Sequence, residues 1–227
     1  MMMNNQLSDE VLIVGGGPVG LTLGCLLLTY NIPCKIIEKR TTRQPFSKAF
    51  SLHARTVELL DLIEIGRIIK HGAKTVRKMV IHSEKKDILH FDFSILKDLD
   101  FGSVFSFPQD KLEQVLEEKY LSLGGVINFG TELVSLKQQD DSVITRIQQQ
   151  NPDQSFTNFV SNHKFVIGCD GAHSQVRSFT NANFIGQSYD DSFIVADGKL
   201  STKFNRKNIN LSEGHTFLSP KGYTMIF

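Results

Sequence analysis

The chain has 227 residues, enough for one large domain or two small ones with a substantial buried core. Its 25 basic and 24 acidic residues nearly balance, so bulk charge gives no reason to expect a nucleic acid or an anionic membrane as partner. Three cysteines are too few for a disulfide framework. We therefore expect them to be small core residues, in a protein of the reducing cytoplasm.

The first apolar stretch has the length of a membrane span, because no charged residue occurs between Val11 and Cys34. However, a Gly-Gly-Gly-Pro run at 15–18 and Pro33 interrupt it near its two ends. The first basic residue is Lys35, so the basic region that begins a signal peptide is missing. We predict neither a transmembrane segment nor a targeting signal, but a buried strand, turn and helix.

The turn in this stretch has the glycine spacing of a dinucleotide-binding unit. Residues 11–14 (VLIV) form an uninterrupted apolar run, which is typical of a strand buried on both faces. Gly15, Gly17 and Gly20 then complete G-x-G-x-x-G. In that motif the three glycines allow a tight turn, close approach of the backbone to a pyrophosphate and close packing of helix on strand.

The elements that follow strengthen the prediction of dinucleotide binding. Residues 19–30 are predicted to form a helix whose N-terminal amides and dipole point at the phosphates. Residues 34–37 form a second apolar strand, and Glu38 follows it. A carboxylate at that place accepts hydrogen bonds from a ribose.

Further elements alternate between helix and strand. Apolar spacing and flanking glycines predict a helix from about Ala54 to Ile69 and a second one that opens at 107–110 and ends at Gly124-Gly125. Alternation around a polar turn predicts a hairpin over 76–93. Further strands are predicted at 126–129, 133–137, 143–147, 165–168 and from 192 onward, with a solvated turn at 148–154.

A second motif follows the strand at 165–168. Six residues match the pattern G-x-D-G-x-x-S-x-V-R position by position: Gly168, Asp170, Gly171, Ser174, Val176 and Arg177. With the glycine-rich fingerprint upstream of it, the chain resembles the single-component FAD monooxygenases, the flavin-dependent aromatic hydroxylases. The resemblance covers residues 10 to 200.

This resemblance implies roles in FAD binding for several residues. Asp170 is expected to accept hydrogen bonds from hydroxyls of FAD, and Gly171 to leave room for the cofactor. The planar fork of donors on Arg177 suits a phosphate or a carboxylate, although a structural ion pair is an open alternative. His173 occupies a variable place in the motif and is expected at the surface.

Two further positions are carried over from the family. Lys48 stands where family members commonly have an arginine that reaches the FAD pyrophosphate, and a lysine offers a point charge in place of a bidentate fork. Gln109 matches a position that hydrogen-bonds near the flavin, with plain helix capping as the alternative. The candidate cofactor-binding residues are therefore Gly15, Gly17, Gly20, Glu38, Lys48, Gln109, Asp170, Gly171 and Arg177.

The family chemistry needs no catalytic side chain, because the flavin makes and breaks the bonds. The resemblance implies FAD as cofactor, NADPH or NADH as reductant, and hydroxylation of a small aromatic or hydrophobic substrate through a flavin C4a-hydroperoxide. The sequence has no C-x-x-C, H-E-x-x-H or G-x-S-x-G, and we predict no catalytic residue and no metal. Open alternatives are a related flavoprotein reductase or halogenase, a non-catalytic or partner-dependent FAD-binding fragment, and an NAD(P)-only dehydrogenase, against which the Asp170-Gly171 motif argues.

The expected fold is α/β, a three-layer Rossmann-like FAD/NAD(P)-binding fold interrupted by an incomplete antiparallel substrate-domain sheet. We assign residues 1–75 and 101–185 to the FAD-binding domain, and 76–100 and 186–227 to the substrate-domain sheet. The family's third FAD segment contains Gly-Asp, a dipeptide that this sequence lacks. We therefore expect a C-terminally truncated chain, whose partner is a missing C-terminal half or a second copy.

Overall fold

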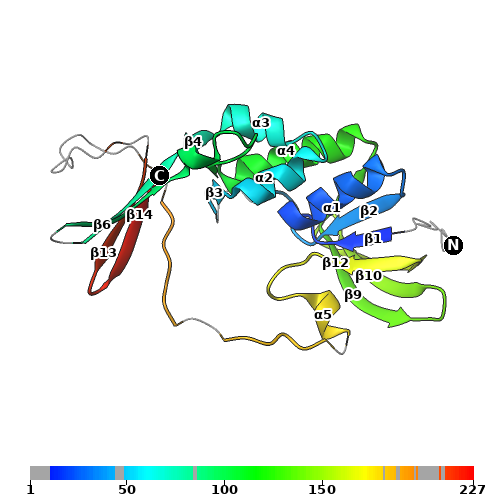
Figure 1. The fold of residues 1–227 in the computed structure, drawn as a ribbon. Coiled ribbons are helices and arrows are strands. Elements are labelled where there is room, and N and C mark those ends of the chain that lie inside the picture. Colours follow the sequence, from blue (N-terminus) through cyan, green and yellow to red (C-terminus); the bar gives the residue numbers. More distant parts are fainter. Residues whose placement is uncertain are drawn as a thin grey trace. The chain divides into compact units, whose positions relative to one another are not determined.

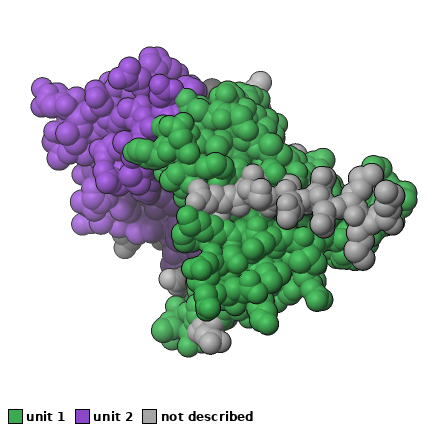
Figure 2. Space-filling model, turned by 90° about the vertical axis from the view of Figure 1, so that its right-hand side faces the viewer, with its two compact units in different colours: residues 1–46, 110–189 green, residues 47–109, 190–227 purple. Residues whose placement is uncertain are grey.

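The structure is a computed structural model. It describes residues 11–43, 49–83, 86–180, 182–187, 190–196, 198, 210 and 213–227. Contacts within the chain define two compact units, residues 1–46 with 110–189 (unit 1) and residues 47–109 with 190–227 (unit 2), which are coloured separately in Figure 2. The domain boundaries proposed from the sequence remain a prediction.

Unit 1 is built on a parallel sheet. Its strands are β1 (Val11–Val14), β2 (Cys34–Glu38), β8 (Val126–Phe129) and β12 (Phe165–Gly168), in the order β12-β1-β2-β8. All three pairings are parallel. Every residue of β1 is buried, because both faces of the sheet are covered, and an apolar strand without polar interruption is what such a position requires.

The two faces of this sheet are covered by different layers (Figure 1). Helices α1 (Pro18–Thr29) and α4 (Gln109–Ser122) lie on one face. An antiparallel sheet of order β11-β10-β9 lies on the other, made of β9 (Thr131–Gln138), β10 (Val143–Gln150) and β11 (Phe156–His163). The core between the two sheets contains Leu12, Val14, Ile37, Leu133 and Ile147. This is the predicted three-layer arrangement.

Tyr120 joins the helical layer to the parallel sheet. Its side chain is fully buried, and its hydroxyl donates to the Cys34 carbonyl at 3.0 Å. A Cβ added to Gly24 of α1 would lie 2.7 Å from the Tyr120 ring. Cys25 and Cys34 are buried thiols outside any disulfide, as the sequence predicted, and burial raises the pKa of Cys25 to about 12.

Unit 2 contains two small sheets and short helices. Strands β3 (Ser51–Leu52), β7 (Val104–Ser106) and β4 (Lys74–Val76) form one antiparallel sheet. The other has the order β14-β13-β5-β6, from β14 (Gly222–Ile226), β13 (Gly214–Ser219), β5 (Lys78–His82) and β6 (Asp87–Asp92). Strands β5 and β6 form the predicted hairpin, and β13 and β14 form a second one. The 3₁₀ helix η1 (Phe93–Leu96) follows β6. The pairing of β13 with β5 is parallel, so this sheet is mixed.

The single helix predicted from Ala54 to Ile69 is wrong. The structure has two helices, α2 (Ala54–Asp61) and α3 (Gly66–Gly72). Between them Glu64 has a φ of 64°, which ends the first helix. A Cβ on Gly66 would lie 2.6 Å from the Asp61 side chain, so Gly66 permits the tight re-entry into α3 and does not mark a helix end.

Two other local predictions are corrected. Residues 148–150 belong to β10 and not to a solvated turn, because all three pair with β11 and residues 148 and 149 also pair with β9. Residues 192–196 form no strand, and Ile194 is 91% exposed. Apolar composition alone indicated a strand there, but no neighbouring strand of the described chain pairs with it.

Within the described residues, no helix is both long and apolar enough to cross a membrane. The charge-free stretch that begins at Val11 is divided between β1, the glycine-rich turn and α1, as predicted.

Replacement of Gly24 by alanine should destabilise the chain. The new methyl group would meet the buried Tyr120 ring, which its hydrogen bond to Cys34 holds in place. Overpacking of this kind costs about 1–3 kcal/mol, which the better helix propensity of alanine, worth about 1 kcal/mol, only partly offsets. Urea unfolding measures the difference. Val19→Ala, at an exposed position of the same helix, is the control and should change little; equal stability of both variants would contradict the packing.

Candidate functional site

The glycine-rich turn brings the ends of β1 and β12 together with the start of α1. Gly15 has a φ of 109°, and a Cβ on it would lie 2.4 Å from the Cys169 carbonyl oxygen. A Cβ on Gly20 would lie 1.9 Å from the Gly15 carbonyl oxygen. Both positions therefore admit only glycine, because the contacts are with backbone that cannot move independently. The turn and the helix thus pack as closely as the motif predicts.

Gly17 differs from these two glycines because it borders open space. It is the N-cap of α1 in an extended conformation, and apart from its own neighbours in the chain no atom of the described residues lies within 4 Å of where its Cβ would be. Among the side chains that the structure describes, none caps this helix end. The first amides of a helix lack partners within the helix, and the dipole adds partial positive charge there. The position thus has room and donors for an anionic group.

Glu38 lies next to this turn with its carboxylate buried. Its Oε2 accepts from the Gly16 amide at 2.8 Å, and its Oε1 accepts from the Arg40 amide at 2.9 Å and from Arg40 Nε at 2.8 Å. Burial alone would raise the pKa of Glu38, but the hydrogen bonds from Arg40 and Gly16 and the charge of Arg40 outweigh it and lower that pKa. Glu38 is therefore an oriented, ionised carboxylate at the end of β2.

Arg40 is a residue of this site that sequence reasoning did not single out. Besides the Nε contact, its Nη2 donates to Glu38 Oε2 at 3.3 Å. The pKa of Arg40 is raised by its hydrogen bond to Glu38, and the nearby charge of Glu113 on α4 adds to the effect. Three residues further on, Arg43 pairs with Glu117 of the same helix at 3.1 Å. The sequence signal that could have identified Arg40 is the basic run at residues 39–43. Two arginines of this run interact with acidic residues of α4.

Asp170 organises the loop that follows β12. Its Oδ1 accepts from the Ser174 hydroxyl at 2.5 Å, and its Oδ2 accepts from the amides of Gln175 and Val176 at 2.6 and 3.2 Å. Gln175 begins the short helix α5 (Gln175–Ser178). Gly171 is exposed with a φ of 82° and has open space beside it. Asp170 thus fixes the loop, and one acceptor position of its carboxylate is left over.

Arg177 is engaged within the same loop. Its guanidinium donates to the Ala172 carbonyl and lies 4.4 Å from the centre of the Phe184 ring. The role of Arg177 toward an anionic ligand stays a prediction. His173 is exposed, as expected.

The predicted residues are therefore distributed unevenly. Gly15, Gly17, Gly20, Glu38, Asp170 and Gly171 gather at the carboxyl edge of the parallel sheet in unit 1, the edge at which α/β sheets bind ligands. Gln109 begins α4, and its backbone N–H donates to the Ala49 carbonyl oxygen at 3.0 Å within unit 2. Lys48 lies outside the described residues.

Comparison with known sequences finds relatives over most of the chain. A family model described as an FAD binding domain matches residues 8–218. An uncharacterised aromatic compound monooxygenase of Bacillus subtilis is 35% identical over 178 residues, which are 78% of this chain and 34% of that protein. Anhydrotetracycline monooxygenase of Streptomyces rimosus is 30% identical over 94% of this chain and 40% of its own length. The chain thus spans less than half the length of these relatives.

Solved structures show the same fold. Anhydrotetracycline hydroxylase from Streptomyces rimosus superposes with a TM-score of 0.68 at 31% identity, over 79% of this chain and 35% of that one. A p-nitrophenol 4-monooxygenase from Pseudomonas putida gives a TM-score of 0.73 at 23% identity, over 80% of this chain and 46% of that one. The predicted α/β fold of the Rossmann-like FAD-binding type is confirmed.

The buried Glu38 carboxylate should make stability depend on acid. Because its pKa is lower in the folded chain than the ordinary value of 4.5, its contribution is present above that value and is lost as pH falls through the folded-state pKa. We expect the wild type to lose more free energy of unfolding than Glu38→Gln between about pH 5 and pH 3, as measured by urea titration.

Glu58→Gln is the matched control for this measurement. Glu58 forms an ion pair with Arg55 at 3.1 Å on the exposed surface of α2, where solvent screens the interaction. The Glu58→Gln chain should lose as much free energy of unfolding between about pH 5 and pH 3 as the wild type does. Parallel curves for the wild type and Glu38→Gln would contradict the assigned hydrogen bonds.

Proposed function

We propose that this chain, which belongs to the FAD binding domain family of the flavin-dependent aromatic monooxygenases, binds FAD at the carboxyl edge of its parallel sheet. We further propose that the bound cofactor serves the NADPH- or NADH-dependent hydroxylation of a small aromatic or hydrophobic compound. The observation that carries the proposal is the open, uncapped start of α1 at Gly17, beside the oriented carboxylate of Glu38.

The residues present fit the adenosine and pyrophosphate part of FAD. The space at Gly17 would take the pyrophosphate, with the amides of Val19 and Gly20 as donors, because Pro18 at the first helical position has no N–H. Glu38 would accept hydrogen bonds from the ribose. Because Gly16 and Arg40 already donate to both oxygens, a ribose hydroxyl would replace the longest contact, that of Arg40 Nη2 at 3.3 Å.

The chemistry divides between cofactor and protein. When bound, FAD accepts reducing equivalents from NADPH or NADH and activates O2 at carbon C4a for transfer of a hydroxyl group. The chain's own residues bind and orient: the turn holds the phosphates, Glu38 fixes the ribose, and Asp170 keeps the loop after β12 in place. Lys48, Gln109, Gly171 and Arg177 are proposed as further cofactor contacts on the family resemblance.

The substrate class is proposed from the names of the relatives. These include an anhydrotetracycline monooxygenase and a pentachlorophenol 4-monooxygenase of Sphingobium chlorophenolicum, the latter 28% identical over 81% of this chain and 34% of its own length. Both names denote the oxidation of an aromatic compound. We propose an aromatic small molecule for this chain as well.

A second candidate function is FAD binding that needs a partner for turnover. Within the described residues, β14 is an edge strand with a neighbour on one side only, and Tyr223 and Met225 on it are 54% and 40% exposed. Such an edge can pair with another chain. FAD binding without oxidation of NADPH or NADH in the presence of aromatic compounds would favour this candidate over the complete monooxygenase.

Gly17→Ala should separate cofactor binding from folding. The methyl group meets no atom of the described part of the chain, so the free energy of unfolding without FAD should stay within about 1 kcal/mol of the wild type. The same methyl group would occupy the space proposed for the pyrophosphate, so we expect FAD affinity to fall at least about tenfold, or 1.4 kcal/mol. Titration of flavin fluorescence measures the affinity.

Gly20→Ala is the contrasting variant. Its methyl group would lie 1.9 Å from the Gly15 carbonyl oxygen, so this change should lower the stability of the chain before any ligand is added. An unchanged FAD affinity in a folded Gly17→Ala chain would contradict the proposed phosphate position.

A further inference from the structure

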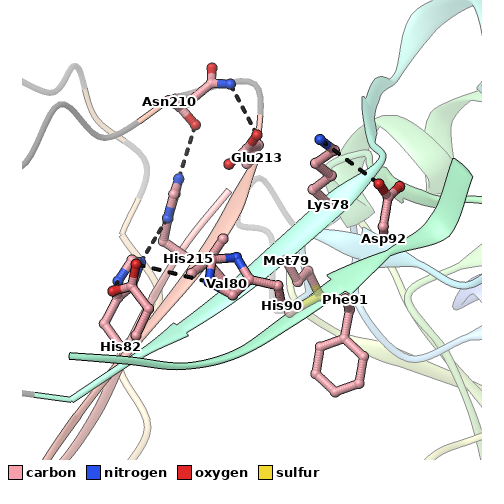
Figure 3. Close-up of a pocket in the computed structure, with 11 residues that line it drawn as sticks. Lys78, Met79, Val80, His82, His90, Phe91, Asp92, Asn210, Glu213 and His215 are labelled. Carbon is pink, nitrogen blue, oxygen red and sulfur yellow. Dashed lines mark hydrogen bonds and ion pairs between the residues drawn. The ribbon is translucent and has the colours of Figure 1, made fainter.

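A line of hydrogen bonds crosses three strands of unit 2, far from the glycine-rich turn in the sequence (Figure 3). Asp87 Oδ1 on β6 lies 2.7 Å from His82 Nδ1 on β5, and His82 Nε2 lies 2.9 Å from His215 Nδ1 on β13. His215 Nε2 lies 2.9 Å from the carbonyl oxygen of Asn210. Both ring nitrogens of each histidine are therefore engaged.

The two histidines are buried, whereas the acid that begins the line is not. His82 is 7% and His215 is 3% exposed, and the Asp87 side chain is 44% exposed. Buried ring nitrogens are costly unless each has a complementary partner. The hydrogen-bond partners of the four ring nitrogens therefore determine how many protons His82 and His215 carry together.

Counting donors gives that number. The Asn210 carbonyl and the ionised Asp87 can only accept, so His215 Nε2 and His82 Nδ1 must each carry a hydrogen. One more hydrogen is needed between His82 Nε2 and His215 Nδ1. The four nitrogens then hold three protons, one more than two neutral imidazoles would hold.

The surroundings place the charge on His82. It contacts the Asp87 carboxylate directly, and its ring stacks on Phe217 with centroids 4.5 Å apart and planes 12° apart. A cation is attracted to the face of an aromatic ring. His215 is farther from the Phe217 ring, at 6.2 Å, and acts as the neutral acceptor through Nδ1.

Other charged groups around the pair have partners of their own. On β5 and β6, Lys78 lies 3.8 Å from Asp92, and His90 lies 4.0 Å from the second oxygen of Asp87. Before β13, Glu213 accepts from the Asn210 side-chain amide at 3.2 Å. These groups line the same pocket of about 330 Å³. Among the described lining residues, the acids outnumber the lysine, which favours a positive charge on the pair.

We propose that His82 and His215 form a binding site for a single proton that ties β5, β6 and β13 to Asn210. Loss of that proton leaves two hydrogens for three links, so one of the three links, to Asp87, to Asn210 or between the two rings, must break. The sheet of unit 2 is therefore pH-sensitive. Because three hydrogens complete the three links of the folded chain, the sheet is most stable with the proton bound and loses stability when rising pH removes that proton.

Nitrogen-15 NMR of the histidine rings in the wild-type 227-residue chain tests this directly. At about pH 6, three of the four nitrogens of the pair should give N–H signals, and His215 Nδ1 should give the one signal of a bare nitrogen. As pH rises, the pair should lose one proton in a single step shared by both residues. Two bare nitrogens at about pH 6 would overturn the proposal.

A variant series adds a test of the coupling to stability. His82→Gln removes the proton site, and His90→Gln, at a side chain that is 66% exposed in the same pocket, is the control. Between about pH 6 and pH 8.5 the wild type and His90→Gln should lose stability relative to His82→Gln in urea unfolding. Parallel pH profiles for all three chains would overturn the coupling, and if His82→Gln does not fold, the NMR measurement on the wild type decides.

Discussion

The fold of unit 1 depends on one close approach of backbone to backbone at the carboxyl ends of β1 and β12. Any side chain at Gly15 would collide with the Cys169 carbonyl, and any side chain at Gly20 would collide with the Gly15 carbonyl. This contact fixes where α1 starts relative to the sheet. The open space at Gly17 belongs to the same turn, and the Gly16 amide of that turn binds the Glu38 carboxylate at the end of β2.

Both acids of the candidate site are held by the protein itself. Asp170 accepts from its own loop and Glu38 accepts from Gly16 and Arg40, so each carboxylate is oriented before a ligand arrives. Preorganisation of this kind lowers the cost of binding, since no side chain must be ordered at that moment. It also limits the hydrogen bonds that each carboxylate can accept from a ligand, because few of its acceptor positions are left. The proposed FAD contacts of these acids are therefore shared contacts, and their geometry is set mainly by the fold.

The parts of the molecule that the sequence predicted well are local. The unit from Val11 to Glu38 and the loop at 165–177 could be recognised because their glycines, apolar runs and acids lie within a few residues of one another. The break between α2 and α3 could not, because apolar spacing does not show that Glu64 takes a positive φ. Composition likewise misassigned residues 192–196, which lack a partner strand among the described residues.

Long-range side-chain partners were also missed. Arg40 donates to Glu38, which lies only two residues away. The second charge that acts on Arg40 is that of Glu113, which lies on α4 and is distant in the sequence. His82 and His215 are 133 residues apart, and only the parallel pairing of β5 with β13 brings them together. No spacing rule connects such residues, so the proton site of unit 2 follows from the topology alone.

The central claim is that FAD binds at the carboxyl edge of the parallel sheet in unit 1. Amide hydrogen exchange of the 227-residue chain, with and without FAD, tests it most directly. We expect slower exchange with FAD at residues 15–21, 38–40 and 170–176, and unchanged exchange in the sheet of β5, β6, β13 and β14. Absence of protection in the glycine-rich turn, or protection confined to another part of the chain, would contradict the claim.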